Sequence, residues 1–214
     1  MIVISAVVLA VMAAGVLLPA EAMAAWIELL GFRPSVVAGQ LDSAFSGRAD
    51  PGLLKLVSAL FAHSTWLHLG GNLAYLWVFG IPVERALGHL RFLSAFVLIG
   101  AFSNLFVALQ VPELERSVIG ASGGVSAIIG IYLGLFPARR IGVWLPLGLF
   151  LQFARIPALL VIGSWFTLQL LYTVFGPMSG AVAWWTHVAG FVAGLLAALA
   201  LRAVAGPFDR HRED

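Results

Sequence analysis

Apolar runs near the length of a bilayer crossing are the strongest constraint on how this chain folds. A membrane-spanning helix needs about 20 mostly apolar residues, because about 30 Å of hydrocarbon is crossed at about 1.5 Å per residue. The chain carries six runs that reach or approach this length, and we predict transmembrane helices at 2–18, 66–83, 92–111, 118–136, 156–175 and 181–201. Of its 214 residues, 61% are hydrophobic and 10% are charged, whereas soluble domains are about 25% charged. We therefore expect an all-α membrane protein built as a six-transmembrane-helix bundle.

The length suits one compact bundle, so we expect a single domain, 1–214, that ends in a short polar tail, 205–214. A seventh apolar stretch, 141–153, is broken by Pro146 and contains Gln152. As a helix it would cover only about 20 Å. We predict that this stretch is interfacial or re-entrant.

Basic residues decide the predicted orientation. One side of the bundle, including the tail, holds eight of them: Arg85, Arg91, Arg139, Arg140, Arg155, Arg202, Arg210 and Arg212. The other side holds four, although its first loop is much longer: Arg33, Arg48, Lys55 and Arg116. The positive-inside rule therefore puts both termini in the cytoplasm. We expect a multi-pass integral protein of a bacterial inner (plasma) membrane.

The first apolar run has an alternative interpretation as a signal peptide, because the A-x-A pattern Ala22-Met23-Ala24 follows it. No Lys or Arg precedes the run, and it is longer than the usual apolar region of a signal peptide. These two features favour a retained helix, and the other five helices keep their orientation either way.

Polar residues inside the predicted spans indicate a candidate site, because polar groups at membrane depth are costly unless they are paired or functional. Asn72 and His187 each lie about 9 Å into a span, and Ser122 lies about 6 Å into another. His68 precedes Asn72 by one helical turn and shares its face. Each residue alone has a structural explanation as a hydrogen-bonding or packing group. Together, three helices bring a hydroxyl, an imidazole and an amide to one layer beneath the outer surface.

This set of groups suits nucleophilic catalysis by a serine. A neutral imidazole removes a serine proton near pH 7, so His187 is the candidate base for Ser122. Ser122 falls near the start of its helix, where backbone N–H groups and the helix dipole favour a developing negative charge. The side chains of Asn72 and His68 can add donors. The approach stays open because three neighbours lack a Cβ: Gly120, Gly123 and Gly124. No carboxylate lies at this depth, so a Ser–His dyad is the simplest prediction.

Other functions fit the sequence less well. Zinc would need His63, His68 and His187, yet the chain has no H-E-x-x-H motif and no intramembrane carboxylate. A transporter is expected to show an inverted repeat or an ionisable pair at mid-bilayer, and the sequence shows neither. The net charge of +2, with scattered basic residues, argues against a nucleic-acid partner. We expect no metal and no cofactor.

Small residues predict close packing between the spans 118–136 and 181–201. In the first span they recur at three- and four-residue spacing: Gly123, Ser126, Ala127, Gly130 and Gly134. In the second, Gly190 and Gly194 form a GxxxG pair. This packing is expected whatever the function is.

The polar residues and glycines fall into four segments: HSTWLHLGGN at 63–72, VERALG at 83–88, GASG at 120–123, and THVAG at 186–190 with Gly194 following. In this order they resemble the H-x4-H-x3-N motif, the turn after the second helix, the GxSG motif and the HxxGxxxG motif of the rhomboid intramembrane serine proteases. The resemblance covers most of the chain from about residue 61 to residue 201.

The resemblance implies a rhomboid-like bundle that cleaves transmembrane helices of membrane-protein substrates near the outer face. Ser122 and His187 would form the dyad. Transition-state stabilisation would come from three residues: Asn72, His68 and Gly120. Five more would support the site: His63, Gly123, Ser126, Gly190 and Gly194. The partners implied are membrane-protein substrates and the lipid bilayer, and the oligomeric state is left open.

The chain departs from the family pattern at two places. Leu54-Lys55 stands where many members have Trp-Arg, and Ser126 stands where well-known members have a tyrosine beneath the histidine. These departures affect the anchoring of the first loop and the positioning of the histidine. The alternative function is a non-catalytic rhomboid-like protein that binds membrane helices. Relatives of that kind typically lack the serine or the histidine, and this chain has both.

Overall fold

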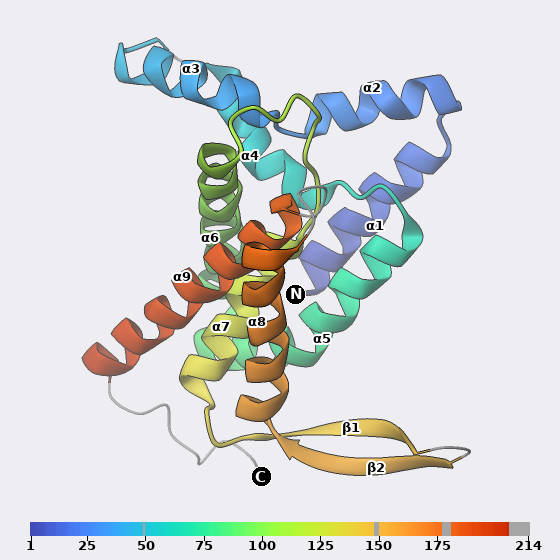
Figure 1. Ribbon diagram of the computed structural model, residues 1–214, viewed down its shortest axis with the longest axis vertical. Helices are drawn as coiled ribbons and strands as arrows, with labels where there is room; N and C mark the ends of the chain where they lie inside the picture. Colours follow the sequence, from blue (N-terminus) through green and yellow to red (C-terminus); the bar gives the residue numbers. More distant parts are fainter. Residues whose placement is uncertain (49, 148–149, 177–180, 206–214) are drawn as a thin grey trace.

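The computed structural model describes residues 1–48, 50–147, 150–176 and 181–205. These residues form a mostly helical fold with one β-hairpin (Figure 1), in the order α1 (Ile2–Val16), α2 (Ala20–Leu30), α3 (Pro34–Phe45), η1 (Pro51–Leu54), α4 (Lys55–Ser58), η2 (Ala59–Phe61), α5 (Trp66–Leu87), α6 (His89–Gln110), α7 (Ser122–Leu135), β1 (Arg140–Leu147), β2 (Phe150–Pro157), α8 (Ala158–Phe175) and α9 (Ala181–Ala205). The predicted spans fall, in order, on α1, α5, α6, α7, α8 and α9. The tail beyond residue 205 lies outside the described residues.

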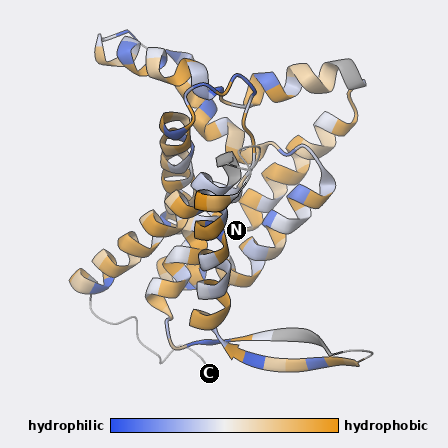
Figure 2. Cartoon of the chain, in the orientation of Figure 1, coloured by the Kyte–Doolittle hydropathy of each residue, from blue (hydrophilic) through white to orange (hydrophobic). Residues whose placement is uncertain are grey.

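Three of the described helices are long and apolar enough to cross a membrane: α6, α8 and the Trp184–Val204 part of α9. The helices α1 and α7 are apolar but shorter. Apolar colour covers much of the outside of the helices (Figure 2), and side chains such as Leu67, Leu98 and Val174 are mostly exposed. Soluble monomers rarely expose so extensive an apolar surface. The chain is therefore a helical membrane protein whose outer surface suits lipid.

The helix α7 lies at the centre of the fold, and all but one of its residues after Ser122 are buried. At its glycines, the backbone of α7 lies directly against the backbone of α9. A side chain on Gly194 would strike the carbonyl oxygen of Ala127, and one on Gly130 would strike that of Phe191. The close packing that we predicted between these two segments is thus present, and it joins the middle of α7 to the middle of α9.

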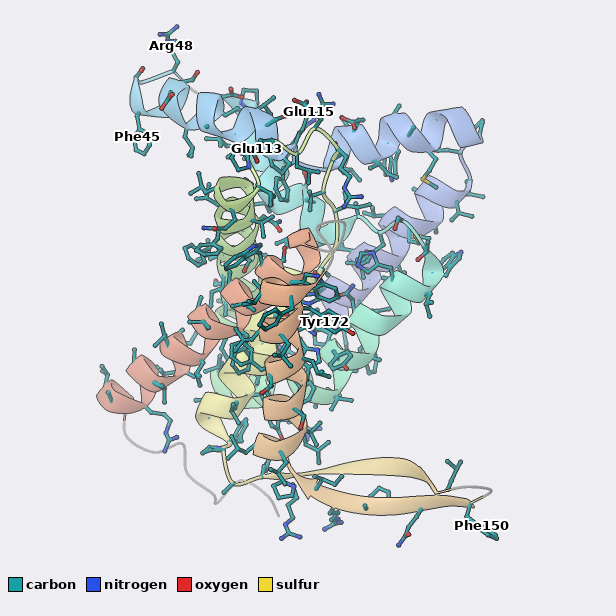
Figure 3. All side chains as sticks on the ribbon, in the orientation of Figure 1. Phe45, Arg48, Glu113, Glu115, Phe150 and Tyr172 are labelled. Carbon is teal, nitrogen blue, oxygen red and sulfur yellow. The ribbon has the colours of Figure 1, made fainter. Side chains whose placement is uncertain are left out.

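The ends of the bundle carry different structures (Figure 1). The helices α2 and α3 lie across one end, and the β-hairpin projects sideways at the other, where α7 ends and α8 begins. Figure 3 shows Phe45 at the outer end of α3 and Phe150 at the far end of the hairpin. The loop 111–121 is hydrogen-bonded to Phe32 and Ser35, where α2 leads into α3, and it continues into α7.

The apolar stretch 141–153 is not a short helix. It forms most of the antiparallel pair β1 and β2, whose register runs from Arg140 opposite Pro157 to Leu147 opposite Phe150. The segment is rich in residues that favour strands, and Pro146 is tolerated because both strands of a two-stranded sheet are edges. The all-α expectation was wrong at this point.

Several predicted span boundaries also move, and two of the shifts have a clear structural cause. We predicted spans starting at 118 and 156, but α7 starts at Ser122 and α8 at Ala158. The residues before α7 are extended because Val118 pairs with Phe32 in an isolated antiparallel bridge. The residues before α8 belong to β2, and Pro157 precedes the helix as its N-cap residue. In both places a tertiary contact replaces the helix that the apolar run suggested.

Candidate active site

Ser122 is the first residue of α7, and hydrogen bonds to three residues hold the turn that precedes it. Val118 exchanges two backbone hydrogen bonds with Phe32, at 2.8 and 3.2 Å. Gly120 N donates to the carbonyl oxygen of Ala59 over 2.8 Å, and Ala121 N donates to Nε2 of His63 over 3.4 Å. The segments before α5 therefore fix the backbone on which the serine is presented.

Gly120 makes this turn possible for two reasons. Its φ of 134° lies in the region that favours glycine. A Cβ placed on it would lie 2.9 Å from Cε1 of His68 and 4.0 Å from Oγ of Ser122. The imidazole of His68 and the hydroxyl of Ser122 thus both lie against the open face of Gly120.

His68 and Asn72 lie on one face of α5, as their spacing predicted. Thr65 caps this helix, and its hydroxyl accepts a hydrogen bond from the backbone N of His68 over 3.1 Å. Asn72 is buried, and its Nδ2 donates to the carbonyl oxygen of His68 over 3.0 Å. These contacts stabilise the first turns of α5, which carry both side chains.

His63 lies in the segment before α5 and makes an edge-on ring contact with His68, with centroids 5.0 Å apart. Burial, together with the neighbouring charge of His68, lowers the pKa of His63 to about 4. The neutral ring is the form whose Nε2 accepts the Ala121 N–H. His63 therefore supports the turn that carries the serine.

His187 lies on α9, and its ring is held from α8. Its Nδ1 lies 2.7 Å from Oε1 of Gln169, and its ring centroid lies 6.0 Å from that of Trp165. Gln169 is buried. Our sequence reasoning missed this residue, although the cost of burying a polar side chain in an apolar span was the signal that could have found it.

A cavity of about 640 Å³ collects most of the predicted site residues. Six of them line it: His68, Asn72, Gly120, Ser122, Ser126 and His187. Ser122 and His187 both line this cavity, and among the described residues no hydrogen bond joins them. In ligand-free sites such bonds are often long and tighten only when substrate is bound.

The remaining predicted residues pack the helices around the cavity. A side chain on Gly190 would strike the carbonyl oxygen of Gly123, and one on Gly123 would lie 3.0 Å from Cβ of Ser103. Gly194 contacts α7 one turn further along. These three glycines let α9 approach α7 closely enough for His187 to share a cavity with the start of α7.

The described part of the cavity offers His187 no carboxylate partner. The described residues that line it include the cation Arg116 and no carboxylate. The described part of the chain also contains no group of three His, Cys, Asp or Glu side chains arranged to hold a metal ion. The side chain at hydrogen-bond distance from Nδ1 of His187 is the neutral amide of Gln169.

The fold and cavity together define a class of protein: helical membrane proteins in which a serine and a histidine from different helices line one cavity. Residues 50–204 match the Rhomboid domain, and the chain belongs to the rhomboid family. Members of this family are typically intramembrane serine proteases, and some rhomboid-like proteins are inactive.

Named relatives match parts of the chain. Over 93 residues it is 32% identical to "Rhomboid protein 1, mitochondrial" of Saccharomyces cerevisiae, covering 41% of this chain and 27% of that protein. Over 81 residues it is 36% identical to "Rhomboid-like protein 11, chloroplastic" of Arabidopsis thaliana, covering 38% and 29%. Over 87 residues it is 30% identical to "Putative rhomboid protease YdcA" of Bacillus subtilis, covering 41% and 43%. The matched segments span less than half of each relative.

Proposed function

We propose that this protein is an intramembrane serine endopeptidase in which Ser122 is the nucleophile and His187 the general base. The observation that carries the proposal is the single cavity onto which Ser122, His68, Asn72 and His187 open from three helices. Membership of the rhomboid family supports the same reaction class.

The proposed reaction is acyl transfer through a covalent intermediate. The Oγ of Ser122 attacks the scissile carbonyl carbon while its proton passes to Nε2 of His187. The protonated imidazole then gives that proton to the leaving amine as the C–N bond breaks. Water then attacks the acyl carbon while its proton passes to His187. The imidazole returns this proton to the Oγ of Ser122 as the acyl bond breaks. Neither a metal nor a cofactor takes part.

Oxyanion stabilisation is assigned to the start of α7 and to α5. The N–H groups in the first turn of a helix have no intrahelical acceptor, and the first turn of α7 begins at Ser122. The Asn72 amide and the His68 ring line the same cavity and supply further donors. Gly120 supports this arrangement because it leaves the space between His68 and Ser122 unobstructed.

We propose transmembrane helices of membrane proteins as substrates, cut near the outer membrane face. The apolar outer surface of the bundle presents the protein to other helices through lipid. The proposed topology has six spans with both termini in the cytoplasm of a bacterial cell, based on the distribution of basic residues. In this topology α2, α3 and the loop before Ser122 face outward, and the hairpin faces inward.

A non-catalytic rhomboid-like protein that binds membrane helices is the second candidate. The absence of a hydrogen bond between Ser122 and His187 among the described residues favours it, and the presence of both side chains in one cavity favours the protease.

Covalent labelling separates these two candidates. Purified protein in detergent is incubated with a fluorophosphonate probe, which forms a covalent bond only with an activated serine. We expect labelling of the wild type and of Ser164→Ala, whose hydroxyl bonds its own helix on the exposed side of α8, and none of Ser122→Ala. A folded wild type that never labels would leave the helix-binding protein as the better proposal.

A further inference from the structure

The position of Gln169 raises a question about the base that the dyad alone does not answer. A neutral imidazole carries its proton on only one nitrogen, and only the bare nitrogen can accept the serine proton. In proteases with a Ser-His-Asp triad a buried carboxylate decides between the two forms. Here the described residues lining the cavity include no carboxylate.

We propose that Gln169 positions His187 and fixes the tautomer that makes it a base; this inference rests on the proposed function. The Oε1 of Gln169 lies 2.7 Å from Nδ1 of His187. A carbonyl oxygen can only accept, so Nδ1 carries the proton and Nε2 is left bare for Ser122. Gln169 is 8% exposed, so little water competes for this bond.

The ring of His187 has a second support on the same face of α8. Trp165 precedes Gln169 by one helical turn, and its ring lies 6.0 Å from the imidazole with a tilt of 38°. The amide fixes one edge of the imidazole and the indole restricts its tilt. A hydrogen bond and a ring contact from one helix therefore define the orientation of the base.

An amide suits this position better than a carboxylate does. Burying a charged carboxylate in an apolar site costs several kcal/mol unless it is fully paired, whereas an amide with a satisfied oxygen avoids most of that cost. The amide orients the ring in the resting state and adds no charge when the imidazole is protonated. The chain thus obtains the tautomer without a third ionisable group.

Three variants test this role in the full-length protein in detergent. Gln169→Met removes the hydrogen-bond acceptor and keeps a side chain of similar length. Gln169→Glu keeps the acceptor oxygen and removes the N–H donors of the amide. Gln152→Met repeats the first change on the exposed strand β2 as a control. Each is assayed for the rate of fluorophosphonate labelling from pH 5.5 to 9, for kcat and KM on a transmembrane substrate, and for thermal unfolding.

We expect Gln169→Met to lower kcat and the labelling rate about 10- to 100-fold, with KM unchanged. This loss is smaller than the roughly 10⁴-fold loss in a Ser-His-Asp protease whose aspartate is replaced by an amide, because that amide imposes the wrong tautomer. Gln169→Glu should retain at least a tenth of the wild-type rate. Its acidic limb should move to higher pH, because a carboxylate stabilises the protonated imidazole. Gln152→Met should match the wild type.

The possible contrary results point to different errors. Gln169→Met with wild-type rate and pH profile would overturn the positioning role while the protease stands. A folded Gln169→Glu as slow as Gln169→Met would show that the amide donates to Nδ1, which overturns the tautomer assignment. A folded wild type that never labels overturns the proposed function, and this inference with it.

A spectroscopic measurement avoids any change at residue 169. Nitrogen NMR of wild-type protein labelled only in histidine distinguishes a protonated from a bare ring nitrogen, and His187→Ala identifies the resonances. We expect Nδ1 protonated and Nε2 bare at pH 8. The opposite pattern would refute the role of Gln169 even if the variants failed to fold.

Discussion

The contact between Gly194 and α7 leads to a quantitative prediction about what holds α9, the helix that carries His187, in place. A Cβ on Gly194 would strike the carbonyl oxygen of Ala127 and lie 2.8 and 2.9 Å from its carbonyl carbon and Cα. All three atoms are backbone within a buried helix, so no side chain can rotate away. Gly194→Ala must therefore push α9 away from α7.

The matched control is Gly163→Ala on α8, where a Cβ would meet nothing within 4 Å. Both changes gain the same helix propensity, about 1 kcal/mol, which cancels in the comparison. Overpacking costs about 1–3 kcal/mol, and the rigid backbone contact puts Gly194→Ala at the upper end. At about 2–4 °C per kcal/mol for a chain of this size, about 3 kcal/mol lowers the Tm by about 6–12 °C relative to Gly163→Ala.

Circular dichroism during heating in one detergent measures this difference, and fluorophosphonate labelling of the same samples reports on the site. His187 lies two helical turns before Gly194 on the same helix, so we expect the labelling rate to fall together with the Tm in Gly194→Ala only. Unfolding of the two variants within about 2 °C of each other would refute the view that α7 and α9 are locked together here.

Three further predictions concern the histidines and Asn72. His187→Ala should abolish labelling and cleavage while the protein still folds, whereas His89→Ala, at the exposed start of α6, should keep both; residual cleavage by His187→Ala would remove that residue as the base. Asn72→Ala should lower kcat about 100- to 1000-fold, the loss expected for one oxyanion donor, with cleavage still measurable; wild-type turnover would exclude Asn72 from the mechanism. Because folding lowers the pKa of His63 from 6.5 to about 4, its contribution to stability is fully present above pH 6.5 and is lost as the pH falls toward 4. His63→Leu should flatten the Tm profile between pH 6.5 and 4; a slope equal to that of the wild type would contradict the assignment.

The positions of the long apolar helices α1, α5, α6, α7, α8 and α9 were predictable, because length and apolarity decide which segments suit a bilayer. The boundaries were not. Val118 and Ile119 extend an apolar run, yet Val118 pairs with Phe32 across a long stretch of sequence, and a contact of this kind has no local signal. The hairpin was missed for the same reason, since a short apolar run with one proline fits a helix or a strand equally well.

The candidate site was predictable in its members and only partly in its contacts. Counting residues along each axis brought Ser122, Asn72 and His187 to one depth, and all three line one cavity. Depth says nothing about how a helix is rotated, so the partner of each side chain needed the structure. Gln169 was not predicted as a site residue. It is a polar side chain in an apolar span, but a lone amide there also fits an ordinary hydrogen bond between helices.

The helix α8, whose Gln169 contacts His187, is also one of the least enclosed helices of the described structure. Of the residues of α8, only Ala158, Ile162 and Gln169 are buried, so most of its circumference meets whatever surrounds the protein. Helices respond to bilayer thickness by tilting, and a tilt of α8 carries the Gln169 amide and the Trp165 ring with it. We therefore expect turnover to vary with acyl-chain length in reconstituted vesicles, which makes the surrounding lipid a determinant of the rate.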